Sequence, residues 1–352
     1  MIDRPDLPIE GMTFVVSGAG GYIGCRLVDE LLRRGAKVRA FDRYFFGVAN
    51  LVDANNAFAD QLTIIKRDIR DAVPEDFEGA DAVLDLAALS NDPSGDLEPE
   101  LTWSINLEGR CHFARMAKAA GVPRYVMSST CSIYGAADKG LSTEETAANP
   151  VSIYAKSNYQ AETEILALTD RSFTACALRN ATVFGLSRRM RFDLVVNLMT
   201  LSAFEKGQIT IMGGGKQWRP LVHVSDVAEG LIRLAIAKRD TISAKIFNIG
   251  VGNYQVQTIA AIVREVLPFQ IQLQFAPDDP DRRNYRVDFS RLANEVGFEP
   301  RIGIEEGVRE VYNALKMGET ENGLHCSTVG WYRHLLQAKA LLSEIELDGR
   351  LF

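Results

Sequence analysis

Short runs of apolar residues alternate with stretches of helical periodicity through the first half of the chain. The apolar runs are typical of strands buried on both faces, and they occupy residues 13–18, 37–42, 62–68, 82–88, 124–129 and 173–179. Apolar residues recur at helical spacing over 21–35, 101–121 and 152–170. Buried strands separated by helices predict a parallel sheet covered on both sides. The pattern therefore predicts an α/β fold with a doubly wound parallel sheet.

The pattern becomes less regular from about residue 186. An apolar run at 245–250 predicts one more buried strand, which would return to the first sheet. We therefore predict a larger domain over 1–185, with the returning strand near 245–250, and a smaller mixed domain over 186–352. The smaller domain would cover the carboxyl edge of the sheet, where open α/β sheets bind their ligands. Residues 327–352 are predicted to form a closing helix followed by a tail.

The overall charge and the scattered cysteines argue against several classes of site. The net charge of −7 gives no reason to expect nucleic acid or an anionic membrane as a partner. No apolar run approaches the roughly 20 residues that span a bilayer, and the N-terminus lacks an apolar signal segment. The five cysteines form no CxxC pair, and the four histidines lack metal-ligand spacing. We expect a reduced, cytoplasmic protein without a bound metal.

A glycine-rich turn joins the first predicted strand to the first predicted helix, in "VVSGAGGYIG". Gly18, Gly21 and Gly24 allow a tight turn and a close backbone approach, and the helix N-terminus favours a pyrophosphate. Asp42 ends the second predicted strand, at the spacing of a carboxylate that accepts hydrogen bonds from an adenosine ribose. An acidic residue there disfavours a 2′-phosphate, so NAD is preferred to NADP. The other interpretation is a purely structural turn.

Further motifs follow the later strands: "RDIRD" after the third, "LAAL" after the fourth and "SSTCSIYG" after the fifth, with Tyr154 on the next helix. Together with the glycine spacing, they resemble the extended short-chain dehydrogenase/reductase superfamily. More narrowly, the chain resembles the NAD-dependent epimerase/dehydratase family, which acts on nucleotide-linked sugars. The similarity extends from residue 13 to about residue 300. It implies a Rossmann-type fold, NAD as the cofactor and a nucleotide-diphosphate sugar as the partner.

The resemblance also implies which residues contact the cofactor. Asp68 and Ile69 would line the adenine, and the small residues after the fourth strand would pass beneath the cofactor. Asn106 matches a helix position near the cofactor, but a satisfied structural amide is an equal interpretation. The implied cofactor-binding residues are Gly18, Gly21, Tyr22, Ile23, Gly24, Asp42, Arg43, Asp68, Ile69, Leu86, Ala87, Ala88, Asn106, Tyr154 and Asn158.

In this family a tyrosine exchanges the hydroxyl proton of the sugar, and Tyr154 with Thr130 and Asn158 would form the catalytic group. A tyrosine of ordinary pKa, about 10, needs a nearby positive charge to ionise at neutral pH. The family's lysine, four residues after the tyrosine, is replaced by Asn158. Lys156 is about 200° from Tyr154 around the helix and cannot substitute.

Three interpretations of this replacement stay open. The positive charge of the oxidised nicotinamide suffices to acidify Tyr154, or a substrate group or water chain relays the proton. Alternatively, the redox chemistry is lost, naturally or through an engineered substitution, and the protein only binds its ligand.

Two neighbours of Thr130 bear on the reaction. The family's 4,6-dehydratases resemble each other in an acidic pair after this hydroxyl residue, whereas this chain has Cys131 and Ser132. The missing carboxylates argue against dehydration. Cys131 is either a reactive thiol or, more in keeping with its type, a small buried filler.

The resemblance places the substrate at the remaining polar positions. Arginine offers a planar, permanently charged donor array that suits diphosphate oxygens. Thr182 stands where the family has a substrate-contacting amide, which leaves the sugar open. The basic cluster at 187–191 either serves a phosphate ligand or forms a solvated turn. The implied substrate-binding residues are Ser90, Thr130, Asn180, Thr182, Asn197, Arg219, Arg282 and Arg283.

The sequence therefore predicts an NAD-dependent nucleotide-sugar epimerase that acts through a transient keto-sugar. One alternative is a one-way 4-oxidase or 4-keto reductase of the same substrate class. Another is a non-catalytic protein that binds NAD or a nucleotide sugar. Apolar faces on the helices that begin near Leu101 and Val151 are compatible with a homodimer, although burial within one domain explains them equally.

Overall fold

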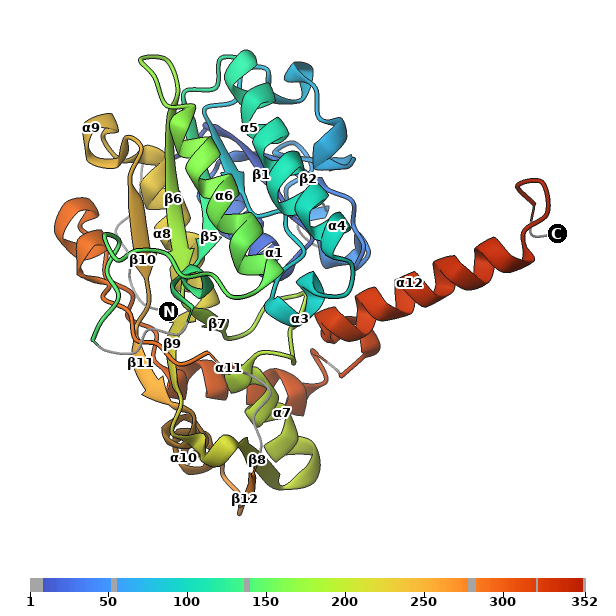
Figure 1. The fold of residues 1–352 in the computed structure, drawn as a ribbon, viewed down its shortest axis with the longest axis vertical. Coiled ribbons are helices and arrows are strands. Elements are labelled where there is room, and N and C mark those ends of the chain that lie inside the picture. Colours follow the sequence, from blue (N-terminus) through green and yellow to red (C-terminus); the bar gives the residue numbers. More distant parts are fainter. Residues whose placement is uncertain (1–8, 52–55, 136–139, 278–282, 321, 351–352) are drawn as a thin grey trace.

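A computed structural model describes residues 9–51, 56–135, 140–277, 283–320 and 322–350. Its centre is a seven-stranded sheet with the order β10-β6-β5-β4-β1-β2-β3, in which every neighbouring pair is parallel (Figure 1). The predicted α/β, Rossmann-type doubly wound sheet is confirmed. The strands are β1 (Thr13–Ser17), β2 (Lys37–Asp42), β3 (Leu62–Lys66), β4 (Ala82–Asp85), β5 (Arg124–Thr130), β6 (Thr174–Asn180) and β10 (Ile246–Ile249).

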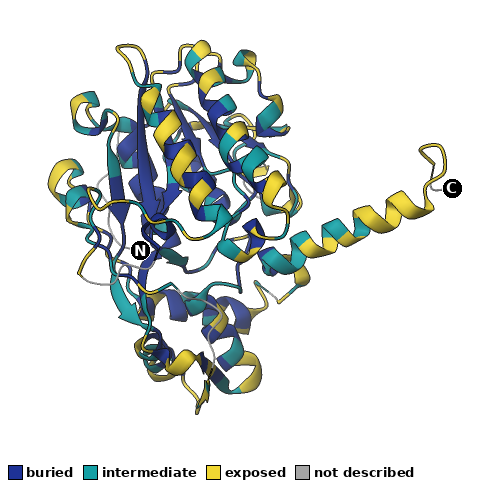
Figure 2. Cartoon of the chain, viewed as in Figure 1, coloured by how far each residue is buried: buried dark blue, intermediate teal, exposed yellow. Residues whose placement is uncertain are grey.

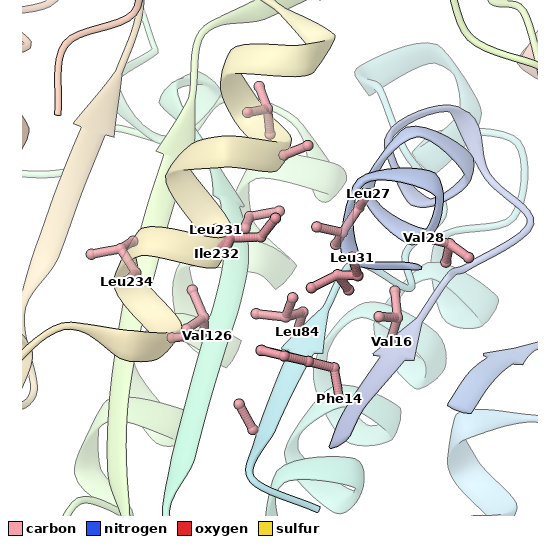
Figure 3. Close-up of a cluster of buried hydrophobic side chains, with 14 of the residues drawn as sticks. Phe14, Val16, Leu27, Val28, Leu31, Leu84, Val126, Leu231, Ile232 and Leu234 are labelled. Carbon is pink, nitrogen blue, oxygen red and sulfur yellow. The ribbon is translucent and has the colours of Figure 1, made fainter. Parts of the chain in front are cut away.

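Alternating side chains of the central strands build two cores, one on each face of the sheet. Phe14 and Val16 of β1 point to one face, where they pack with α1 (Tyr22–Arg33) and α8 (Val224–Ile236) (Figure 3). Val15, between them, points to the other face, which is covered by α5 (Arg110–Ala119) and α6 (Ile153–Ala167). Because both faces are covered, the central strands are buried along their length (Figure 2).

The helix predicted over 101–121 is interrupted in the structure. It consists of α4 (Pro99–Trp103), a π-helical segment η4 (Ser104–Gly109) and α5. The π-helical segment passes tightly over the third strand's loop, because a Cβ at Gly109 would lie 3.0 Å from the Cγ atom of Arg70. Segments of this kind re-aim the side chains that follow them and are frequent at functional sites. Here the residue that follows is Arg110.

The second part of the chain contributes two small sheets. The first has the order β11-β9-β7, and the second pairs β8 with β12. A separate core of apolar residues, including Phe184, Ile209 and Val308, joins them to three helices. The boundary at residue 185 stays a prediction, since α8 packs against the first sheet and β10 is one of its strands. The elements are β7 (Thr182–Phe184), β8 (Gln208–Met212), β9 (Trp218–His223), β11 (Gly252–Gln255), β12 (Gln272–Ala276), α7 (Val195–Lys206), α10 (Val256–Val266) and α11 (Ile304–Met317).

The C-terminal helix α12 (Thr328–Ile345) extends away from the body instead of closing over it (Figures 1 and 2). Its first turns are attached: Trp331 donates a 2.7 Å hydrogen bond from Nε1 to the Phe45 carbonyl, and Tyr332 packs against Phe45 and Phe46. The predicted helix is therefore present, but among the described residues its contacts with the body lie near its start. Shorter helices are α3 (Asp92–Gly95) and α9 (Arg239–Ile242).

None of the helices in the described part of the chain has both the length and the apolar character of a bilayer span. Likewise, the described residues contain no group of three or more His, Cys, Asp or Glu side chains arranged to hold a metal ion.

The aromatic cluster behind α5 allows a test of the packing. The ring centroid of Phe113 lies 5.1 Å from that of Phe41 and 4.7 Å from that of Phe77, both in edge-on contacts. Phe113→Ala is expected to lower the free energy of unfolding by about 3–5 kcal/mol, because it leaves a cavity in a closed core. Phe275→Ala, at a side chain that is 62% exposed, is the control and should change it by less than about 0.5 kcal/mol. Urea unfolding measures both, and equal losses would contradict this account of the core.

Candidate functional site

A cavity of about 710 Å³ lies beyond the carboxyl ends of the central strands. Its wall combines the glycine-rich turn after β1, the ends of β4 and β5 and the start of α6 with residues of the second part of the chain. Strands β1 and β4 are neighbours in the sheet, and the chain leaves them toward opposite edges. A crevice at such a reversal is the usual ligand site of open α/β sheets.

The glycine-rich turn brings the ends of β1 and β4 close together. Gly18 has φ +67°, and a Cβ there would lie 2.9 Å from the Ala87 nitrogen. Gly24 lies in the first turn of α1, where a Cβ would lie 2.1 Å from the Gly18 carbonyl oxygen. No side chain caps the start of α1 at Gly21. The turn thus presents a helix N-terminus, which favours an anion, to the cavity.

Two carboxylates stand at the far end of the cavity. Asp42 accepts hydrogen bonds from the backbone nitrogens of Gly20 at 3.0 Å and Tyr44 at 2.6 Å, and its burial raises its pKa. Burial also favours a raised pKa at Asp68, but hydrogen bonds from Arg70 and Arg43 outweigh it and lower the pKa to about 2. Asp68 is therefore ionised at neutral pH.

The predicted catalytic pair is brought together. Tyr154 lies in the first turn of α6, whose N-cap Ser152 accepts a hydrogen bond from the Ala155 nitrogen at 3.0 Å. Thr130, the last residue of β5, lines the same cavity as Tyr154 and lowers the pKa of its phenol. Burial raises the pKa of Tyr154, an effect that Asp92 reinforces and that Thr130, Arg110 and Arg191 oppose.

Both polar atoms of the Asn158 amide make hydrogen bonds within the protein. Its Oδ1 accepts a 2.7 Å hydrogen bond from Nη1 of Arg110, and its Nδ2 donates at 2.8 Å to the Tyr154 carbonyl. The side chain lines the cavity but is almost fully buried. Asn158 therefore connects the backbone at Tyr154 to a buried cation.

That cation was not anticipated from the sequence. Arg110 donates from Nε to the Asp85 carboxylate at 2.8 Å, and from Nη2 to the carbonyls of Asp85 and Ser128, both at 2.9 Å. The Ser17 hydroxyl donates to the other Asp85 oxygen at 2.6 Å. A signal was present, because position 110 shares the apolar face of its helix with the buried residues Phe113, Ala114 and Ala117.

The basic cluster at 187–191 forms part of the cavity wall rather than a solvated turn. Arg189 and Arg191 are buried, and only Arg188 is exposed. Arg191 donates to Asp193 at 3.0 Å and to the Ser90 hydroxyl at 3.3 Å. Arg189 lies 3.7 Å over the Phe46 ring and donates to the Thr328 hydroxyl.

The other predicted substrate residues mostly meet at the cavity. Asn180 donates from Nδ2 to the Ser128 hydroxyl at 2.8 Å, and Thr182 lies beside it in the wall. Arg219 donates to the Arg283 carbonyl, and Arg283 pairs with Asp92 at 2.9 Å. Arg282 lies outside the described residues.

Two predicted amides do not line the cavity. Asn106 exchanges two hydrogen bonds with the Leu89 backbone, at 2.8 and 3.1 Å. These contacts are those of a satisfied structural amide, and Asn106 is not part of the cavity wall. Asn197 accepts from the Gly185 nitrogen and donates to Tyr22 and to the Arg191 carbonyl. Both side chains are fully buried and hold the loops that form the wall, because a buried amide must satisfy its polar groups nearby.

Cys131 fits the description of a buried filler. It is fully buried, its thiol donates to the Arg179 carbonyl at 3.3 Å, and burial raises its pKa. A thiol in such surroundings stays protonated and inert.

Residues 14–250 match the NAD dependent epimerase/dehydratase family. The chain belongs to this family. It is 28% identical over 309 residues to UDP-glucuronic acid decarboxylase 1 of Arabidopsis thaliana, a match covering 84% of this chain and 68% of that protein. It is 29% identical over 315 residues to UDP-glucose 4-epimerase of Mycolicibacterium smegmatis, covering 84% and 96%.

Among solved structures, MoeE5 in complex with UDP-glucose and NAD has a TM-score of 0.76 and 27% sequence identity, covering 88% of this chain and 100% of that one. The family is NAD dependent, as the sequence predicted. Two buried polar atoms of the cavity wall are available to hydrogen-bond a polar ligand such as a dinucleotide or a nucleotide sugar. Among the described residues, Nε of Arg189 and Oδ1 of Asn180 have no hydrogen-bond partner.

The glycine-rich turn provides a matched test of cofactor binding. Gly18 and Gly79 both have φ +67°, but a Cβ at Gly79 would meet nothing within 4 Å. Each alanine variant should lose about 1–2 kcal/mol of stability from its backbone conformation. Only Gly18→Ala should also weaken NAD binding by at least about tenfold, because it pushes the end of β4 away. Calorimetric titration with NAD measures this, and equal affinities of the two variants would contradict the close approach.

Proposed function

We propose that the protein is a nucleotide-sugar epimerase that acts through a transient keto-sugar. The observation that carries the proposal is the Thr130–Tyr154 pair, which opens on the same cavity as the glycine-rich turn and the arginines Arg191, Arg219 and Arg283. A cavity with a phosphate-favouring turn at one end and a hydroxyl pair in the middle suits a dinucleotide and a sugar hydroxyl that must lose a proton.

The proposed site residues divide the cavity between cofactor and substrate. The glycine-rich turn would hold the pyrophosphate of NAD, Asp42 would accept the ribose hydroxyls, and Asp68 and Ile69 would lie at the adenine. Leu86, Ala87 and Ala88 would support the middle of the cofactor. NAD held there would supply a reversible hydride acceptor for the sugar carbon.

The chain's own part in this reaction is proton transfer. Thr130 orients the reacting hydroxyl, and the Tyr154 phenolate takes its proton as the carbon is oxidised. In the reverse direction Tyr154 would give the proton back to the oxygen of the keto-sugar, bound with its opposite face to the cofactor, which would yield the inverted alcohol. Tyr154 would then end in the ionisation state in which it began.

Arginines at the other end favour a diphosphate. Arg219 and Arg283 line the cavity on the side of the second part of the chain, and permanent planar cations suit diphosphate oxygens. The names of the relatives, which are UDP-sugar enzymes, support a UDP-sugar as the substrate class.

Residues at the same site bear on two other reactions, 4,6-dehydration and one-way oxidation or reduction. Cys131 and Ser132 provide no carboxylate, and the buried thiol is no substitute, which disfavours 4,6-dehydration. A one-way 4-oxidase or 4-keto reductase uses the same pair and stays the second candidate. It differs in consuming cofactor, so absorbance of reduced NAD rises or falls with every turnover, whereas epimerisation leaves it constant.

Tyr154→Phe tests the catalytic assignment. Loss of the phenol should lower the interconversion of UDP-sugar epimers by about 10²–10⁴-fold while NAD still binds, because the phenol is the proton acceptor in the proposed reaction. Tyr159→Phe, at an exposed tyrosine of the same helix, is the control. Product analysis by chromatography of a panel of UDP-sugars measures the rates. If the parent protein and Tyr159→Phe both bind NAD but convert none of the UDP-sugars in the panel, the non-catalytic alternative is favoured.

We also propose a homodimer through α4 and α6. Leu101, Val151 and Tyr159 are large apolar side chains exposed on this face. Light scattering should give twice the monomer mass, and Val151→Arg with Tyr159→Arg should halve it, because buried charges oppose association. An unchanged mass in that double variant would place the interface elsewhere. A cytoplasmic location stays a prediction.

A further inference from the structure

We propose that Arg110, acting through the amide of Asn158, supplies the positive charge beside Tyr154 that a lysine at position 158 would otherwise provide. Arg110 is a positioning residue in this account, because its guanidinium contacts Asn158 and the ends of two strands rather than the cavity. The inference rests on the proposed function, which requires an ionisable Tyr154.

The guanidinium is fixed in place by acceptors on three sides. The Asp85 carboxylate holds Nε, the carbonyls of Asp85 and Ser128 hold Nη2, and Asn158 holds Nη1. Arginine has five N–H donors in a rigid fork, so this set leaves little rotational freedom. The side chain is fully buried, where a charge is weakly screened.

Asn158 transmits this charge to the tyrosine's turn of the helix. Its carbonyl oxygen accepts from the cation and its Nδ2 group donates to the Tyr154 backbone carbonyl at 2.8 Å, so the amide fixes the distance across which the charge of Arg110 lowers the pKa of the phenol. A lysine would join its charge to the same turn directly. The arginine–amide pair instead divides the work: Arg110 carries the charge, and Asn158 fixes the spacing.

Other charged groups around Tyr154 do not replace this pair. Lys156 is exposed on the opposite side of α6. Arg191 also favours the phenolate, but it is paired with Asp193, and Asp92 opposes ionisation while pairing with Arg283. Asp85 partly neutralises Arg110, but it contacts Nε, while Nη1 is directed to Asn158. Arg110 is thus the cation with a bonded route to the tyrosine's turn.

The geometry reverses the effect expected of a lysine at position 158. In Asn158→Lys, an ammonium replaces the oxygen that accepts from Nη1, so two cations meet in a buried space. The variant that resembles the rest of the family should therefore be impaired. Removing the arginine at the same time should restore room and charge balance for the lysine.

Four variants test the pair. They are Arg110→Met, Asn158→Lys, the double variant Arg110→Met with Asn158→Lys, and the control Arg179→Met. Arg179 is also a buried arginine in an ion pair, with Glu162 at 2.5 Å, but no hydrogen bond joins it to Asn158 in the described structure. It therefore reproduces the loss of stability without touching the proposed route.

Turnover of UDP-sugars as a function of pH gives the first readout. Arg110→Met should move the acidic limb of the profile to higher pH by about one unit, because a nearby cation favours the phenolate. Asn158→Lys should lose at least about tenfold in kcat, and the double variant should recover at least tenfold over either single variant. Arg179→Met should lower the unfolding midpoint and leave the limb in place. A gain of activity in Asn158→Lys alone, or an unmoved limb in Arg110→Met, overturns the inference.

A second readout separates this inference from the proposed function. The tyrosinate absorbance of Tyr154, taken as the difference between each protein and its Tyr154→Phe form, titrates with pH whether or not a sugar is turned over. Its midpoint should rise in Arg110→Met and return toward the parent value in the double variant. Inactive proteins with this pattern would contradict the epimerase and keep the inference. An unchanged midpoint in folded Arg110→Met overturns the inference even if the enzyme is active.

Discussion

The ion pair between Arg110 and Asp85 lies where the sheet, the π-helical segment and the start of α6 meet. A buried ion pair is costly to desolvate, and removing one partner alone destabilises a protein by about 3–5 kcal/mol. Here the cost is offset because the remaining polar groups are satisfied. Ser17 at the end of β1 donates to Asp85, and carbonyls at the ends of β4 and β5 accept from Arg110. The pair thus ties three adjacent strand ends together beneath the cavity.

The two halves of the cavity depend on this anchored edge in different ways. At the glycine-rich turn, backbone approach decides the shape, since Gly18 has no room for a Cβ beside the end of β4. On the opposite wall, side chains of the second part of the chain extend toward the end of β4, as Arg191 does to Ser90. Asn197 and Asn106 have no place in the wall, yet they hold its loops by satisfying backbone groups. Residues that line the cavity and residues that support its wall therefore alternate along the same segments.

Local rules carried the sequence interpretation a long way. Runs of apolar residues predicted the strands and the glycine spacing predicted the turn, whereas Thr130 and Tyr154, which line one cavity, were implied by the family resemblance. What local rules could not reach was the chemistry of long-range contacts. Arg110 lies 48 positions from Asn158, and the sequence around each residue does not identify the other as its hydrogen-bond partner. The burial of Arg189 and the arrival of Tyr332 at the cavity likewise depend on how distant segments pack.

The replacement of lysine by Asn158 takes on a different meaning in this setting. Taken alone, an amide at that position removes a charge and leaves the tyrosine without help. A buried amide also needs partners, and this one has an arginine on one side and the tyrosine's own carbonyl on the other. An arginine placed there for structure alone would still favour the phenolate, although Asp85 offsets part of its charge, because the low polarity of the interior extends the field of a fixed cation. Structural satisfaction of the amide and electrostatic support of the phenol are then the same contact. A substitution at either position is constrained by the other, and the identity of residue 158 cannot be interpreted without residue 110.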